Sequence, residues 1–110
     1  MRNELRYGRA TVLRLTIGLS SQKVLLAPPP NSRRAFLFVV NTHATNILFM
    51  NLGNEASTLD IPILPANGAI GFDNFVPQDD VYLVANGAGT TAVLVYSNKG
   101  LNDYPMLAGG

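Results

Sequence analysis

The sequence predicts an all-β domain: a single antiparallel β-sandwich or jelly-roll-like barrel of about 7–8 strands with an N-terminal arm. Turn residues recur about every 10 to 12 positions, and the segments between them are short and rich in β-branched and aromatic side chains. No segment shows the apolar period of an amphipathic helix. The 110 residues suffice for one such domain.

The expected strands follow from their apolar patterns. Arg9–Ile17 alternates apolar with polar side chains, which is typical of a strand with one buried face. Arg34–Asn41 is apolar on both faces, which predicts a central strand covered on both sides. Pro62 confines the strand Ile61–Leu64 to an edge, because proline cannot donate to a neighbouring strand. The other expected strands are short apolar runs between turns: Lys23–Ala27, Ile47–Leu52, Ala69–Phe75, Val81–Ala85 and Thr90–Tyr96.

Turn chemistry predicts how these strands connect. Pro28-Pro29-Pro30 removes three backbone donors in a row and indicates an extended, rigid connector. The polar segment 41–46 predicts a hairpin loop, and the segment 86–89 (Asn-Gly-Ala-Gly) predicts a second hairpin. Segment 87–92 also matches the Gly-x-Gly-x-x-Ala string of dinucleotide sites, but a strand is expected after it where phosphate binding needs a helix.

Three segments are expected along the chain: a basic N-terminal arm with the first strand (1–20), the β-sandwich (21–97) and a C-terminal tail (98–110). A signal peptide is not expected, because Arg9 and Arg14 interrupt the apolar residues near the start. A membrane span is not expected either, since the apolar run Ala35–Val40 is far shorter than the about 20 residues that a spanning helix needs. Four phenylalanines fall within strand patterns and are expected in the core: Phe36, Phe38, Phe49 and Phe72.

Charge is unevenly distributed, although the net charge is only +1. Residues 1–34 hold seven basic residues and one acidic residue, whereas residues 35–110 hold one basic and six acidic residues. Either the two halves face each other in one fold, or the basic arm lies on an acidic surface of a neighbouring subunit. Nucleic acid is disfavoured as a partner, because the basic residues are interleaved with aliphatic ones and not clustered with aromatics.

The residues that carry chemistry are few, so neither catalytic residues nor a cofactor or metal site is expected. The chain has one histidine and no cysteine, whereas a metal enzyme of this fold needs several ligands that converge. His43 is expected as a surface or turn residue. Asp79 and Asp80 are adjacent and could be calcium ligands. Neighbouring aspartates in a turn more often accept hydrogen bonds from backbone amides, and that role is expected here.

Several turn and strand motifs recur together in a known group of proteins. Leu26–Arg34 forms a proline/asparagine–arginine turn, Ala35–Asn41 is a strand that ends in Asn, and Ile47–Gly53 returns and ends in Gly. With the later Asn-Gly turn, the stretch from about Lys23 to Tyr96 resembles small β-sandwich structural proteins of tailed bacteriophages. The members of that group are capsid decoration (cement) proteins or bases for head fibres and spikes. The resemblance implies a non-enzymatic virion protein that binds the outside of a capsid, with the decoration type preferred, and that is made in the host cytoplasm.

A basic arm and apolar subunit contacts are the expected means of attachment. The expected partners are the major capsid protein or another virion protein and further copies of this chain, with a trimer favoured and no membrane partner. The residues expected to bind a partner are Arg2, Arg6, Arg9, Arg14, Tyr7, Arg33, Arg34 and Tyr104. Two alternatives stay open: a head-fibre, neck or tail-associated adaptor, and a receptor- or carbohydrate-binding β-sandwich module.

Overall fold

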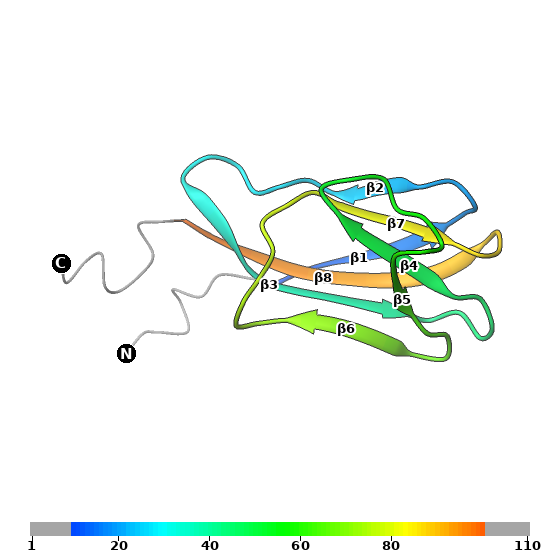
Figure 1. The fold of residues 1–110 in the computed structure, drawn as a ribbon. Helices are drawn as coiled ribbons and strands as arrows, with labels where there is room; N and C mark the ends of the chain where they lie inside the picture. Colours follow the sequence, from blue (N-terminus) through cyan, green and yellow to red (C-terminus); the bar gives the residue numbers. More distant parts are fainter. Residues whose placement is uncertain (1–9, 101–110) are drawn as a thin grey trace.

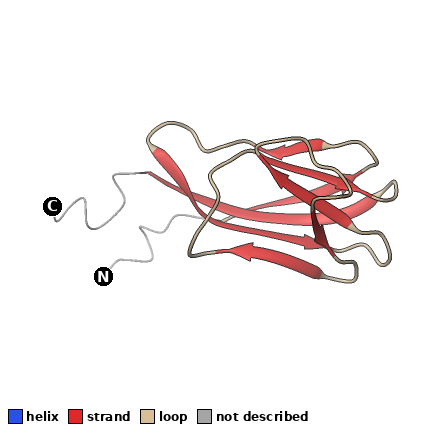
Figure 2. Cartoon of the chain, in the orientation of Figure 1, coloured by secondary structure: helices blue, strands red, loops and turns tan. Residues whose placement is uncertain are grey.

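A computed structural model describes residues 10–100, which form eight strands and no helix (Figures 1 and 2). Their order is β1 (Thr11–Ile17), β2 (Gln22–Leu25), β3 (Ser32–Asn41), β4 (Leu48–Leu52), β5 (Ile61–Ile63), β6 (Gly68–Phe72), β7 (Val81–Ala85) and β8 (Thr90–Gly100). The strands form two antiparallel four-stranded sheets, with the orders β1-β8-β3-β6 and β2-β7-β4-β5. The predicted all-β sandwich is confirmed.

The pairing of the strands is nested. β1 pairs with β8, β2 with β7, β3 with β6 and β4 with β5, and further pairs join β3 to β8 and β4 to β7. The pattern is that of one long hairpin, with β1–β4 in one arm and β5–β8 in the other, folded into two packed sheets. This is the jelly-roll arrangement. The strand β5 lies at an edge, as Pro62 predicts.

Two predicted hairpins are wrong. β3 and β4 lie in different sheets, and so do β7 and β8, so the polar loop 41–46 and the glycine turn 86–89 each carry the chain from one sheet to the other. Turn residues determine that the chain reverses, but they do not determine whether the next strand pairs with the previous one or packs across from it. β8 also continues to Gly100, four residues beyond the expected end at Tyr96.

The core lies between the two sheets. In β1, the alternation places Leu13, Leu15 and Ile17 on the inner face, and Ile17 is fully buried. This strand, which was expected together with the arm, is therefore part of the sandwich. The other fully buried apolar side chains come from both sheets: Leu37, Val39, Leu48, Met50, Val81, Leu83 and Leu94.

The expectation that Arg34–Asn41 is covered on both sides holds for one side only. β3 is a central strand, flanked by β8 and β6, and its Leu37 and Val39 are fully buried. Phe36, Phe38 and Val40 alternate with them and are only partly buried. Phe36 and Phe38 are therefore not core residues, because the described segments place no second layer over this face.

Candidate interaction surface

The outer face of the β1-β8-β3-β6 sheet is apolar. Residues opposite each other on antiparallel strands share a face, so the register defines rows of side chains across the sheet. One row contains Val12, Val95, Phe38 and Gly71, and the next contains Arg14, Val93, Val40 and Ala69. We call this surface the outer apolar face and define it as Val12, Phe36, Phe38, Val40, Ala69, Val93 and Val95.

Phe38 lies near the centre of the outer apolar face and is positioned by its neighbours. Its ring stacks with that of Phe36, with 6.3 Å between the centroids. On the other side it lies over Gly71, where a Cβ atom would come within 2.8 Å of the ring. The absence of a side chain at Gly71 thus lets the ring lie against the neighbouring strand.

The outer face of the second sheet differs because the chain covers it. The 53–60 connection is held at β4, where the Asn51 side chain donates to the Glu55 carbonyl, and beside β2, where the Ala56 N–H donates to Ser21 Oγ at 2.8 Å. It therefore crosses β7, which lies between these two strands (Figure 1). Val84 of β7 is only 4% exposed, although alternation places it on the outer face. Within residues 10–100, one sheet is thus covered by its own loop, whereas the other has no second layer over its partly buried apolar face.

Arg14 lies within the outer apolar face, at the edge strand β1. It is exposed, and within residues 10–100 no carboxylate forms an ion pair with it. A cation beside an apolar surface is a common arrangement in protein–protein contacts, in which arginine is enriched. The structure thus brings Arg14 to the apolar residues that sequence reasoning did not select.

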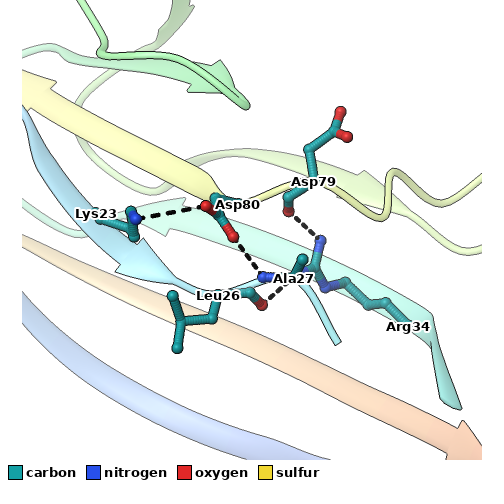
Figure 3. A network of polar contacts seen from close by, with 6 residues as sticks. All are labelled: Lys23, Leu26, Ala27, Arg34, Asp79 and Asp80. Carbon is teal, nitrogen blue, oxygen red and sulfur yellow. Dashed lines mark hydrogen bonds and ion pairs between the residues drawn. The ribbon is translucent and has the colours of Figure 1, made fainter. Parts of the chain in front are cut away.

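Arg34, which the sequence places among the partner-binding residues, is buried and makes its hydrogen bonds within the chain. It is 2% exposed, because the chain folds over its guanidinium (Figure 3). The guanidinium donates to the carbonyls of Leu26, Pro77 and Asp79 at 2.7–3.0 Å. Burial lowers the pKa of Arg34, and Asp79 and Asp80 act in the opposite direction. The side chain stays charged, since arginine does not lose its proton in proteins.

Gln78 completes the attachment of β3 to the connection between β6 and β7. Its side-chain oxygen accepts from the Arg34 N–H at 2.6 Å, and its nitrogen donates to the carbonyls of Arg34 and Val76. The Gln78 side chain thus satisfies the backbone of Arg34, while the Arg34 side chain satisfies the carbonyls on either side of Gln78, and together they fix the loop at this end of the sandwich.

Asp80 joins the basic first part of the chain to the acidic second part. Its carboxylate accepts from the Ala27 N–H at 2.6 Å and lies 3.5 Å from Lys23 Nζ (Figure 3). The Ala27 N–H, followed by the charges of Lys23 and Arg34, holds the pKa of Asp80 below its usual value. For Lys23 and Arg34, the first interpretation of the charge asymmetry applies: the two halves face each other within one fold.

The remaining residues expected to bind a partner divide into two groups. Arg33 is exposed at the beginning of β3. Five residues lie outside the described residues: Arg2, Arg6, Tyr7, Arg9 and Tyr104. The expected tail 98–110 also lies outside them, apart from its first three residues, which belong to β8.

Polar side chains in and beside the loop 41–46 form hydrogen bonds with backbone groups. His43 Nδ1 accepts from the N–H groups of Thr45 and Asn46, which confirms it as a turn residue. Asn41 is fully buried and donates to the carbonyls of Asn46 and Ile63. Within residues 10–100, no group of three His, Cys, Asp or Glu side chains could hold a metal ion, and no helix is long and apolar enough to span a membrane.

Comparisons with known proteins give no significant match, because no family model fits the chain and neither a curated protein nor a solved structure is similar enough. The function is therefore inferred from the chain's own residues and fold.

Proposed function

We propose that this chain is a non-enzymatic structural protein of a virion, which attaches to the outside of a bacteriophage capsid through protein–protein contacts. The observation that carries the proposal is the outer apolar face, over which residues 10–100 place no second layer, whereas the corresponding face of the second sheet is covered by the 53–60 loop. Contiguous exposed apolar surface on a soluble protein is typical of an interaction site. Phe36 and Phe38 are aromatic side chains of the kind enriched at such interfaces.

The choice of a virion rests on two supports. The jelly-roll arrangement occurs widely in viral capsid proteins, although it also occurs in lectins and cupins. The turn and strand motifs of 26–53 resemble those of small phage structural proteins. Attachment would bury the outer apolar face against the major capsid protein, while Arg14 and the basic residues of the arm contact acidic groups at the rim.

Binding to empty capsids of the phage that encodes this chain tests the proposal. The protein is mixed with capsids that lack it and sedimented, and the bound copies per particle are counted. Val93→Glu is the diagnostic variant, because it places a charge in the centre of the face while the opposite Arg14 can pair with it and preserve the fold. Thr58→Glu, on the exposed loop over the other sheet, is the matched control.

The basic arm is tested separately by deleting residues 1–9. The deletion removes Arg2, Arg6 and Arg9 and ends before β1, which contributes to the core. If the arm contacts acidic capsid groups, the deletion weakens binding and makes the remaining binding less sensitive to salt. Unchanged affinity and salt dependence would remove the arm from the proposal and leave the apolar face as the sole contact.

A further inference from the structure

Three of the four edge strands carry features that prevent pairing with another chain. β5 has three residues and contains Pro62, which cannot donate. β2 has four residues, and its register is broken between Lys23 and Leu25. β6 has five residues, two of which are Gly68 and Gly71. Short length, proline, lysine, bulges and glycine are the usual means by which natural edge strands avoid pairing.

The fourth edge strand, β1, carries one charged side chain, Arg14, and lacks the other protective features. Thr11–Ile17 is the longest of the four, contains neither proline nor glycine, and keeps an unbroken register with β8 over all seven residues. Its side away from β8 has no neighbouring strand among residues 10–100. Val12 is 49% exposed and the inner-face residues Leu13 and Leu15 are only partly buried. A strand added here would therefore bury apolar surface on both faces as well as pair backbone groups.

We propose that β1 pairs in an antiparallel manner with β1 of a second copy, about a twofold axis at Leu13. Outer-face residues of one copy lie opposite outer-face residues of the other only if the twofold axis passes through a residue. A register shifted by one position would place outer-face side chains opposite inner-face ones. An axis at Arg14 would place two like charges opposite each other, which is destabilising. An axis at Leu13 instead places Val12 of each copy opposite Arg14 of the other.

The Leu13 register also gives side chains on both faces of the sheet favourable contacts with the second copy. On the inner face, Leu13 meets Leu13 of the second copy, and Thr11 meets Leu15. On the outer face, the aliphatic stem of Arg14 covers Val12, the most exposed apolar residue of β1, while its guanidinium stays in water. A twofold contact closes after two copies, so it removes this edge without forming a fibre. It yields an eight-stranded sheet with a continuous outer apolar face, and a dimer in place of the trimer expected from the resemblance.

Charge substitutions at Val12 test this register by sedimentation equilibrium. The wild-type protein is expected to reach twice the 11.8 kDa of one chain at concentrations up to about 1 mM. Val12→Glu places a carboxylate opposite Arg14 twice per dimer and is expected to lower the dimer Kd about tenfold, whereas Val12→Lys is expected to raise it about tenfold. Thr58→Lys, an exposed change on the 53–60 loop over the other sheet, should leave the Kd unchanged.

The results that overturn the inference are equally specific. A monomer at about 1 mM or a trimer would exclude the twofold pairing of β1. A dimer that responds equally to the two charges at Val12 would exclude the register, because only an axis at Leu13 places Val12 opposite Arg14. None of these outcomes concerns capsid attachment, so failure here and failure of the proposed function can be distinguished by the sedimentation and capsid-binding experiments.

Discussion

Replacement of Arg34 by methionine should destabilise the domain far more than replacement of an exposed arginine would. Arg34→Met retains an unbranched apolar stem but removes the guanidinium, which donates to the carbonyls of Leu26, Pro77 and Asp79. A hydrogen bond from a charged group contributes roughly 1.5–3 kcal/mol to stability. The variant loses these bonds, but it also avoids the cost of removing a charged guanidinium from water on folding, which offsets part of the loss. A net loss of about 3 kcal/mol is expected.

The assay is thermal and denaturant unfolding beside a matched variant. A loss of about 3 kcal/mol corresponds to a fall in Tm of roughly 12–24 °C for a domain of this size. Arg14→Met removes an exposed arginine that has no ion-pair partner within residues 10–100, so it should change the free energy of unfolding by less than about 0.5 kcal/mol. If the two variants unfold alike, Arg34 does not hold the loops together, and its role as a structural residue is refuted.

Three further changes give distinct outcomes in unfolding experiments. Gly68→Ala should destabilise the protein by about 1–3 kcal/mol, because the new Cβ atom meets a backbone carbonyl, whereas Gly18→Ala has open space around it and should be neutral or slightly stabilising; equal melting temperatures would contradict this. Asn41→Leu should cost about 2–3 kcal/mol, since it removes the hydrogen bonds from a fully buried side chain to the carbonyls of Asn46 and Ile63. Because the pKa of Asp80 is lowered by folding from 3.8, its contribution is present above about pH 4 and is lost as the pH falls through the lowered value. Asp80→Asn should therefore weaken the protein at pH 7 and flatten its acid unfolding curve, unlike Glu55→Gln; matching curves for wild type and Asp80→Asn would refute the linkage.

The local elements could be predicted because their signals are local. The alternation of Arg9–Ile17 and the proline in β5 depend on side-chain direction and on a missing donor, and both were interpreted correctly. The hairpins were wrong because the sheet that receives each next strand is determined by packing between distant segments. No turn residue encodes that choice.

The candidate surface was harder to predict than the strands. The two apolar faces of β3 are visible in the sequence, but only the structure shows that the described residues 10–100 place no covering layer over one of them. Arg34 could not be placed from the sequence either: a charged residue in a basic segment suggests a partner, whereas in the fold its guanidinium donates to three carbonyls, at 26, 77 and 79. A long apolar strand without the alternation expected of a half-exposed sheet is the signal that points to an outer binding face.

Counting the copies bound per capsid by Val93→Glu, Thr58→Glu and wild-type protein at equal concentration is the most direct test of the central claim. The outer apolar face predicts stoichiometric binding by wild type and by Thr58→Glu, and a loss of at least about tenfold in affinity for Val93→Glu, because binding would bury an added charge against apolar surface. Each variant's unfolding curve accompanies the count, so that loss of fold is distinguished from loss of binding. Wild-type occupancy by a folded Val93→Glu protein would contradict the claim that this face attaches the chain to the particle.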